Sequence, residues 1–354
     1  MPAEWETHTS TWLAWPHYRS DWPGKFEPIP WVYAEIIRHL GRHERVDLIV
    51  NNRASETQAR KVLTKANALS ENVVFHRWPT NRVWTRDSGC TFVAGTPGLS
   101  SRAKSRDLAL SPNLAAIKWR FTAWAKYLNY QHDDKIGSRM AEAAGVDEIR
   151  AVHGKSRVVL EGGSIDVNGK GTLLTTEECL LSRTQQRNPA MSRKDYEKLF
   201  SNYLGIRKVI WLSSGITGDD THGHVDDITR FVAPDTVVTA VESDPNDTNY
   251  EPLRENIRRL RATSDQNGKP LAIIELPMPS PVVFEGRRLP ASYANFYIAN
   301  GIVLVPVFND PNDRVALDIL ADLFPDREIV GIYSGDLIWG YGALHCMTQQ
   351  QPGV

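Results

Sequence analysis

The second half of the chain contains three stretches in which apolar residues follow the same succession of spacings. Each stretch is predicted to form two strands, an amphipathic helix and a third strand, because short apolar runs flank a segment with helical spacing. The predicted elements are strands 164–167 and 171–175, helix 192–204 and strand 208–212; strands 228–232 and 236–241, helix 250–262 and strand 271–276; and strands 293–299 and 302–305, helix 313–323 and strand 328–332. The units begin at residues 164, 228 and 293, so the repeat is 64 and then 65 residues long.

The first half contains similar elements in a less regular order. We predict strands 9–15, 46–50, 73–77, 91–94 and 158–163, and helices 31–40, 55–69 and 132–144, with Ser55 capping the second helix. Two looser units would begin near residues 11 and 91. A strand-strand-helix-strand unit cannot bury its own sheet face, so repeats must close against one another. The prediction is a closed, roughly five-fold α/β assembly in a single domain, residues 1–354; an open α/β sheet of another topology is the alternative.

Composition and charge argue against several classes of protein. The formal net charge is −1, so there is no global basic field of the kind that binds nucleic acid. No apolar run approaches the length of a membrane span, and no signal peptide begins the sequence. The cysteines, Cys90, Cys179 and Cys346, are odd in number and far apart, which argues against a disulfide framework or a structural zinc site. We therefore expect a cytosolic protein in a reducing compartment; the sequence leaves open whether it forms a homo-oligomer.

Residues 97–113 carry the weakest structural signal in the chain. They are rich in Gly, Ser and Pro with alternating charges, which predicts a mobile surface loop. Such a loop would act as a lid if it borders a cleft.

Cys346 stands in an unusual context near the end of the sequence. It follows Trp339-Gly-Tyr-Gly-Ala-Leu-His345, in which the glycines let the backbone turn tightly and approach another group closely. Taken alone, Cys346 would be interpreted as a buried free cysteine that acts as a small apolar residue. Three other segments favour a reactive thiol instead.

Two of these segments place a carboxylate where a cation could bind. In Trp84-Thr-Arg86-Asp87, an aromatic ring could cover the face of a flat cation while the carboxylate takes hydrogen bonds at its edge. The alternative is a structural contact between Arg86 and Asp87, with Trp84 in the core. Glu161 ends an apolar run before Gly162-Gly163, so it is either a solvated turn carboxylate or one pressed against a substrate.

The third segment, residues 219–227, reads Asp-Asp-Thr-His-Gly-His-Val-Asp-Asp and is dense in titratable groups. Two histidines separated by one residue, without a cysteine or His-x-x-x-His spacing, are a poor zinc signature. A general acid/base role for His224 fits better, because the carboxylates around it, such as Asp220 and Asp226, keep an imidazolium available near neutral pH. A calcium-binding or merely solvated acidic loop is the alternative.

One thiol, one histidine and several carboxylates together indicate a substrate that arrives as a cation. A cysteine protease would need the thiol and the histidine but fewer acids. A small guanidine is the natural partner, because a guanidinium offers five donors in a plane and binds carboxylates in a bidentate manner.

In combination, five motifs resemble those of the agmatine deiminase family, which belongs with the bacterial peptidylarginine deiminases to the pentein group of guanidine-modifying enzymes. They are Trp-Thr-Arg-Asp at 84–87, Leu-Glu-Gly-Gly at 160–163, Arg-Asn-Pro at 187–189, Gly-His-Val-Asp at 223–226 and His-Cys-Met-Thr-Gln-Gln-Gln-Pro at 345–352. The resemblance covers residues 12–352. It implies a five-bladed, pseudo-symmetric α/β propeller, the pentein fold. It also implies a hydrolase without metal or organic cofactor that converts agmatine into N-carbamoylputrescine and ammonia.

The resemblance assigns catalytic roles to five residues. It implies that Cys346 is the nucleophile, which forms a covalent thiouronium intermediate, and that His224 is the general acid/base. Asp87 and Asp226 would hold the guanidinium nitrogens. Glu161 would hold the substrate and orient His224.

The resemblance also implies a binding pocket, and the chain departs from the family there. Trp84 would line this pocket, and Asp220 falls where the family has an acid that would meet the distal amine of agmatine. Tyr341 stands where the family usually has a glycine, and His222 where an asparagine is common. The departures leave the reacting groups intact but alter the pocket wall.

Other functions remain open from the sequence. A peptidylarginine deiminase, another guanidine hydrolase or an amidinotransferase would use similar residues. A non-catalytic propeller that binds polyamines or guanidines is a further alternative, which a reactive Cys346 would argue against.

Overall fold

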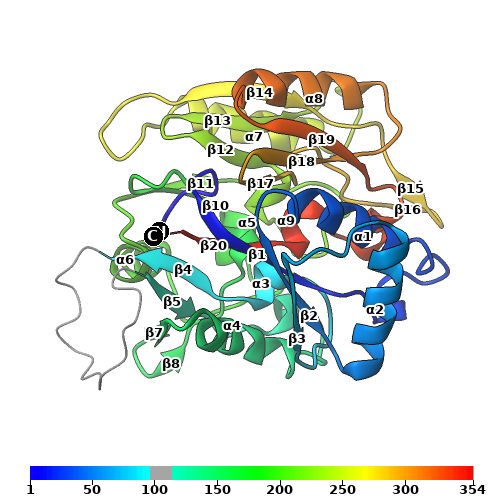
Figure 1. Ribbon diagram of the computed structural model, residues 1–354. Helices are drawn as coiled ribbons and strands as arrows, with labels where there is room; N and C mark the ends of the chain where they lie inside the picture. The colour runs from blue at the N-terminus through cyan, green and yellow to red at the C-terminus, as the bar shows by residue number, and fades with distance from the viewer. Residues whose placement is uncertain (96–113, 354) are drawn as a thin grey trace.

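The computed structural model describes residues 1–95 and 114–353 and has a mixed α/β fold (Figure 1). The predicted loop at residues 97–113 lies outside the described residues. Within the described ranges, no helix combines the length and the apolar character that a membrane crossing requires.

The three predicted repeats of the second half form three sheets of one topology. In each, the middle strand pairs antiparallel with the preceding strand and parallel with the following one, and a helix connects the parallel pair. The elements are β9 (Asp166–Val167), β10 (Thr172–Thr176), α5 (Glu177–Leu181), α6 (Arg193–Leu204) and β11 (Lys208–Leu212); β12 (Thr229–Ala233), β13 (Thr236–Val241), α7 (Tyr250–Arg261) and β14 (Ala272–Pro277); and β17 (Tyr297–Ala299), β18 (Ile302–Val307), α8 (Asn312–Leu323) and β19 (Glu328–Tyr333). The predicted repeat is therefore confirmed.

Two sheets of the first half follow the same plan. One contains β4 (Thr91–Ala94), β5 (Leu114–Lys118), α4 (Ile136–Ala144) and β6 (Asp147–Arg150). The other contains β1 (His8–Ala14), α1 (Ile29–Leu40) and β2 (Arg45–Val50), extended by α2 (Arg53–Lys65) and β3 (Val73–Arg77). Its middle strand, β1, takes its antiparallel neighbour from far along the chain: β20 (Gln349–Pro352). The first and last segments of the described chain thus share one sheet.

Short helical turns connect these units near the middle of the molecule. They include α3 (Thr85–Ser88), α9 (Leu344–Met347), η4 (Gly162–Ser164) and η5 (Val225–Asp227), and α3 packs against both α9 and η4. Figure 1 shows α2, α4, α6 and α8 around the outside, and β1, β20 and α9 in the middle. The remaining elements are the turns η1 (Arg19–Asp21), η2 (Ala123–Ala125), η3 (Asp133–Lys135) and η6 (Leu337–Gly340), and two hairpins, β7 (Val152–His153) with β8 (Ser156–Arg157) and β15 (Val283–Phe284) with β16 (Arg287–Arg288).

The local sequence explains the most regular elements. The strands β13 and β18 consist mainly of apolar residues and are buried along their middle, as parallel strands covered on both faces usually are. Helix α6 begins with a capping box between Ser192 and Asp195 and ends at Gly205, whose φ of 71° favours glycine.

Three predictions of secondary structure are wrong. The N-terminal cap of α2 is Asn52, which accepts from the backbone nitrogen of Ser55 at 3.0 Å, so Ser55 lies inside the helix. Residues 158–163 form no strand beyond a single bridge between Arg120 and Val159, because the chain turns into η4 at the two glycines. The strand predicted from residue 293 begins only at Tyr297, and the irregular residues before it are nevertheless buried.

Candidate active site

Five of the predicted site residues meet where four helical turns come together. Cys346 lies in α9, Asp87 in α3, Glu161 directly before η4, and His224 and Asp226 at η5. All five side chains are buried, with at most 4% of any residue exposed. Residues far apart in the sequence therefore form one compact group.

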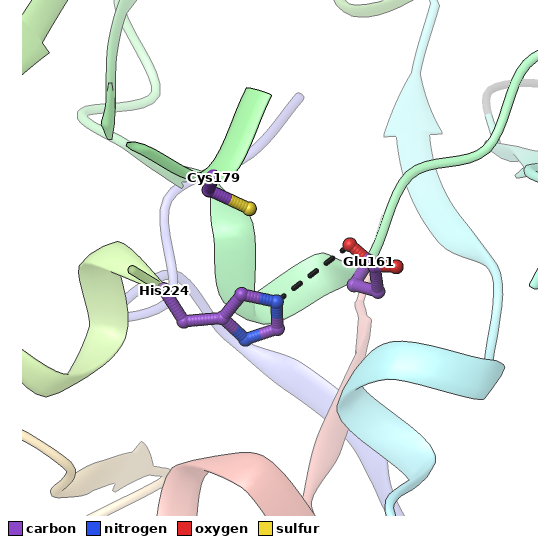
Figure 2. A group of neighbouring side chains, drawn as sticks. All are labelled: Glu161, Cys179 and His224. Atoms are coloured by element: carbon purple, nitrogen blue, oxygen red, sulfur yellow. Dashed lines mark ion pairs between the residues drawn. The ribbon is translucent and has the colours of Figure 1, made fainter. Parts of the chain in front are cut away.

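His224 lies among three carboxylates. Its Nε2 is 3.6 Å from Oε2 of Glu161, and its Nδ1 is 3.8 Å from Oδ1 of Asp87 and 3.9 Å from Oδ1 of Asp226. Figure 2 shows the ring directed toward Glu161, with Cys179 on the neighbouring turn. Burial alone would lower the pKa of His224, but Asp87 and Glu161 raise that pKa well above its ordinary value. His224 is therefore a cationic acid at neutral pH.

Arg187 holds Glu161 in place. Its Nε lies 3.3 Å from both carboxylate oxygens of Glu161, and its Nη2 donates to the backbone oxygen of Thr221. Burial would raise the pKa of Glu161, but Arg187 and then His224 lower it, so the carboxylate stays ionised. The Arg-Asn-Pro motif thus supplies the cation that fixes Glu161 beside His224.

Asp87 is oriented by two hydrogen bonds. The backbone nitrogen of Gly163 donates to its Oδ1 at 3.0 Å, and Nε1 of Trp124 donates to its Oδ2 at 2.8 Å. Burial raises the pKa of Asp87 to about 6, although His224 opposes this rise. A Cβ at Gly163 would lie 2.6 Å from Nδ1 of His224, so only glycine lets this backbone approach both side chains.

Cys346 is held by Asn295, from the irregular segment before β17. Nδ2 of Asn295 donates to Sγ of Cys346 at 3.1 Å and to Oδ1 of Asp227 at 2.9 Å. Sγ also lies 3.6 Å from Oδ2 of Asp226. Burial, followed by the charges of Asp226, Asp227 and Asp87, raises the pKa of the Cys346 thiol well above its ordinary value. The site therefore holds a neutral thiol until positive charge arrives beside these acids.

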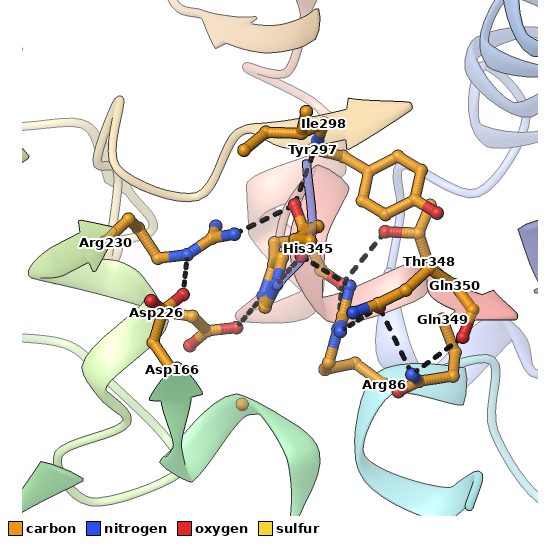
Figure 3. A network of polar contacts seen from close by, with 12 residues as sticks. Arg86, Asp166, Asp226, Arg230, Tyr297, Ile298, His345, Thr348, Gln349 and Gln350 are labelled. Atoms are coloured by element: carbon orange, nitrogen blue, oxygen red, sulfur yellow. Dashed lines mark hydrogen bonds and ion pairs between the residues drawn. The ribbon is translucent and has the colours of Figure 1, made fainter. Parts of the chain in front are cut away.

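His345 connects Asp226 to a second carboxylate deep in the molecule. Its Nδ1 lies 2.6 Å from Oδ2 of Asp226 and its Nε2 lies 2.8 Å from Oε2 of Glu4 (Figure 3). Burial would raise the pKa of both acids, but the cations around them lower both values, and ionised carboxylates only accept hydrogen bonds. The ring of His345 therefore links the two carboxylates, one at each of its nitrogens.

Glu4 is the centre of this buried network. It accepts from Nη2 of Arg86 at 3.1 Å, from Nη2 of Arg230 at 2.9 Å and from the backbone nitrogen of Ile298 at 2.9 Å. Arg86 thus pairs with Glu4 and donates to Gln350, not to Asp87, which overturns the alternative of an Arg86–Asp87 structural contact. Asp87 remains available to a ligand.

A cavity of about 460 Å³ leads to Cys346 and Asp87. Trp84 lines it, and a Cβ at Gly342 would lie 2.7 Å from Cζ3 of Trp84 and 3.1 Å from Cβ of Cys346. Glycine at this position therefore keeps open the narrow space between the indole ring and the thiol. The walls include aromatic rings and charges of both signs, among them Tyr127, Lys126 and Asp220.

Asp220 lies in the cavity wall but is already engaged. Its Oδ1 pairs with Nζ of Lys126, and its Oδ2 accepts from the hydroxyl of Tyr127 at 2.7 Å. The structure thus brings Trp84 and Asp220 to the same cavity, and it places Asp220 away from the carboxylate group around His224.

Two clusters have spacings that a metal ion could use within the described residues: Glu161 with Cys179 and His224, and Asp226 with Asp227 and Cys346. Most of these side chains have protein partners. Arg187 pairs with Glu161, Asn295 donates to both Asp227 and Cys346, and His345 pairs with Asp226. These side chains therefore suit a flat organic cation, which donates hydrogen bonds to carboxylates along its edge, better than a compact metal ion.

Sequence reasoning missed several residues that contact the site. Asn295 fell inside a predicted strand, and Trp124 follows an apolar strand without a motif of its own. His345 stands out in the sequence only as the neighbour of Cys346, and Glu4 belongs to none of the motifs. A buried position for Trp124 would have been the best available signal, since its indole N–H needs an acceptor when buried.

The chain is similar to several known proteins over almost its whole length. The profile of the Porphyromonas-type peptidyl-arginine deiminase family matches residues 1–352. An agmatine deiminase of Pseudomonas aeruginosa (strain LESB58) is 34% identical, over 99% of this chain and 95% of that protein.

Solved structures give the same result. The agmatine deiminase of Enterococcus faecalis superimposes with a TM-score of 0.87 at 30% identity, covering 99% of this chain and 95% of that one. A C. jejuni agmatine deiminase variant with substrate bound gives a TM-score of 0.82 at 28% identity, with the same coverage of both chains.

Proposed function

This chain belongs to the Porphyromonas-type peptidyl-arginine deiminase family, and we propose that it is an agmatine deiminase, which hydrolyses agmatine to N-carbamoylputrescine and ammonia. The observation that carries the proposal is the meeting of one thiol, one cationic histidine and several carboxylates where the cavity ends. Membership of the family bears out the resemblance predicted from the five motifs.

In this proposal the guanidinium binds between Asp87 and Asp226, with Trp84 beside it. Asp87 lines the cavity next to Cys346, and Oδ1 of Asp226 has no hydrogen-bond partner in the described part of the chain. An unpaired buried carboxylate oxygen is costly unless a ligand supplies the missing donor. Glu161 completes the set of acids and orients His224 through their contact of 3.6 Å.

Substrate binding would activate the nucleophile. The same carboxylates that raise the pKa of Cys346 would be neutralised by a bound guanidinium, so the thiol would lose its proton to solvent more readily. The thiolate then attacks the central guanidinium carbon. His224, which is an imidazolium, donates its proton to the departing nitrogen, and ammonia leaves.

The second half of the reaction reverses the role of His224. The covalent thiouronium on Cys346 is still cationic and stays between Asp87 and Asp226. Neutral His224 takes a proton from water, and the resulting hydroxide attacks the same carbon. The C–S bond of this adduct then breaks, the hydroxyl proton passes to the released sulfur, and the ureido product leaves while Cys346 is again a thiol. No cofactor enters this scheme.

The test is ammonia and ureido-group release from agmatine, free arginine and a blocked arginine peptide, with Cys346→Ala and Cys90→Ala as matched variants. Agmatine turnover should be abolished by Cys346→Ala and retained by Cys90→Ala. The family name favours peptidylarginine as a second candidate substrate, and turnover of the peptide alone would replace agmatine with it. Retained turnover in Cys346→Ala would sink the whole scheme.

The proposal also includes the finer architecture and setting of the enzyme. Five sheets share the same order of antiparallel and parallel strands, and the C-terminal strand β20 pairs with β1 of the first sheet. Both features support a five-bladed propeller that forms one catalytic domain. In this proposal the enzyme binds a small cationic guanidine and neither nucleic acid nor a membrane. Its location is the cytoplasm.

A further inference from the structure

Lys126 forms an ion pair with Asp220, the carboxylate that would bind the distal amine of agmatine. Its Nζ pairs with Oδ1 of Asp220, and Tyr127 donates to Oδ2, so both oxygens of Asp220 are engaged by neighbouring residues of one segment. Lys126, Tyr127 and Asp220 all line the cavity that leads to Cys346. An ammonium group reaching Asp220 would therefore meet a cation of the protein already bound there.

The backbone holds Lys126 near Asp220 independently of their ion pair. Nε2 of Gln185 donates to the backbone oxygens of Trp124 and of Asp220, each at 3.1 Å, which ties the two segments together. Trp124 is also anchored by its hydrogen bond of 2.8 Å to Asp87. The pairing is thus more than a chance contact of a surface lysine, although 41% of the Lys126 side chain is exposed.

The conformation of this segment is itself unusual. Ala123, Trp124 and Ala125 have φ values of 48°, 59° and 53°, a left-handed turn that non-glycine residues rarely adopt. Such a conformation persists only where surrounding contacts enforce it, and it is found preferentially at functional sites. Here it lets one segment contact two acids of the cavity: Trp124 binds Asp87 beside the thiol, and Lys126 binds Asp220.

Asp21 is a second carboxylate of the same cavity wall. Its Oδ1 lies 3.4 Å from Nε of Arg82, whereas its Oδ2 has no hydrogen-bond partner in the described part of the chain. Burial raises the pKa of Asp21 to about 7, so this carboxyl carries only part of a negative charge at neutral pH and is a weak partner for an ammonium. Arg287 lines the same cavity and donates to the hydroxyl of Tyr341 at 3.4 Å. The cavity wall carries three cations, Arg82, Lys126 and Arg287, against the three carboxylates of Asp21, Asp87 and Asp220, so its formal charges sum to zero.

We propose that Lys126 is a specificity-determining residue: by neutralising Asp220 it removes the advantage of an ammonium tail and admits a guanidine whose far end is uncharged or carries a carboxylate. This inference rests on the proposed deiminase function and concerns only the end of the substrate away from the reacting carbon. Agmatine remains a substrate, but its ammonium contributes little to recognition.

Three guanidines with the same four-methylene chain test the proposal: agmatine, butylguanidine, and guanidinopentanoate, which carries a carboxylate. The measured quantities are kcat/KM for each, and Kd for each in a Cys346→Ala background. The wild type should handle agmatine and butylguanidine within about threefold of each other, because screened pairs at a surface are weak. Lys126→Met should raise the ratio of kcat/KM for agmatine to kcat/KM for butylguanidine about three- to tenfold. The same variant should lower the ratio of kcat/KM for guanidinopentanoate to kcat/KM for butylguanidine. Lys126→Arg should keep the wild-type ratios.

The outcomes separate this inference from the proposed function. A ratio of agmatine to butylguanidine that is unchanged or lower in Lys126→Met would overturn the role of Lys126, whatever the rates. A wild type that turns over none of the guanidines would overturn the deiminase function, while the Kd ratios would still decide the role of Lys126. Failure of all three to bind would overturn both.

Discussion

The Nδ1 nitrogen of His345 lies 2.6 Å from the Oδ2 oxygen of Asp226, within a buried network centred on Glu4. Burial would raise the pKa of Asp226, but its hydrogen bond with His345 helps to lower that pKa. We therefore predict that His345→Asn weakens agmatine binding to a Cys346→Ala background by at least about tenfold and destabilises the fold by about 1–3 kcal/mol. Calorimetric titration and thermal unfolding measure these two effects.

A second buried histidine provides the control for this prediction. His8 pairs with Glu44 at 3.4 Å and with the backbone oxygen of Glu4 at 2.7 Å, but it touches none of the reacting groups. His8→Asn should lower stability while leaving the Kd for agmatine within about twofold. Equal Kd values for the two variants would show that His345 acts only through stability.

Asn295 should matter for the chemical step, because it is the hydrogen-bond donor to the sulfur of Cys346. Removing a donor to a developing thiolate costs about 1.5–3 kcal/mol, so Asn295→Ala should lower kcat about ten- to a hundredfold. The value of kcat from steady-state kinetics and the rate of alkylation of Cys346 by iodoacetamide should fall together. A normal alkylation rate with a reduced kcat would place the role of Asn295 elsewhere.

Binding of guanidines should weaken in acid because of Asp87. Its pKa is raised to about 6, so the carboxylate is ionised and binds a cation above that pH, and it is protonated and loses this ability below it. In the Cys346→Ala background, agmatine affinity should be constant at neutral pH and fall about tenfold per pH unit below pH ~6. Trp124→Phe removes a hydrogen bond to the ionised form, so the midpoint should move to higher pH. A midpoint near pH 4 in both proteins would contradict this assignment.

Gly342→Ala should block the narrow part of the cavity. The added Cβ would lie 2.7 Å from the ring of Trp84, close enough that the indole or the nucleophile helix must move. We expect kcat/KM for agmatine to fall at least about tenfold. Gly95→Ala is the matched control, because no atom of residues 1–95 or 114–353 lies within 4 Å of its new Cβ, and it should retain full activity. Full activity in Gly342→Ala would mean that substrates do not pass between Trp84 and the thiol.

The sequence was informative where chemistry and local motif coincide. Cys346, His224 and Asp226 stand in segments so rich in glycine or titratable groups that ordinary core packing explains them poorly. The repeat could be predicted because strands such as β11 and β13 are mainly apolar, and the structure reproduces their predicted bounds.

The rest depended on long-range contacts that no local pattern contains. Asn295 lies in an apolar stretch, so a strand was the natural prediction, and only the approach of α9 gives its amide a role. Nothing in the sequence around Lys126 distinguishes it from a surface lysine. Its contact with Asp220 depends on the left-handed turn at residues 123–125. Glu161 was predicted to end a strand, but the chain turns there because Gly162 and Gly163 must approach Arg86 and His224 closely.

The pairing of β1 with β20 has a consequence for how the enzyme matures. Trp12 bonds through its indole nitrogen to Gln351, across a sequence separation of 339 residues. Contacts of such separation carry a large loop-closure cost and generally form late. The helix that carries Cys346 directly precedes β20, so its docking is coupled to that last pairing. On the ribosome, a nascent chain would therefore carry Asp87, Glu161 and Asp226 long before it could present the thiol to them, and deiminase activity would appear only once synthesis has passed β20.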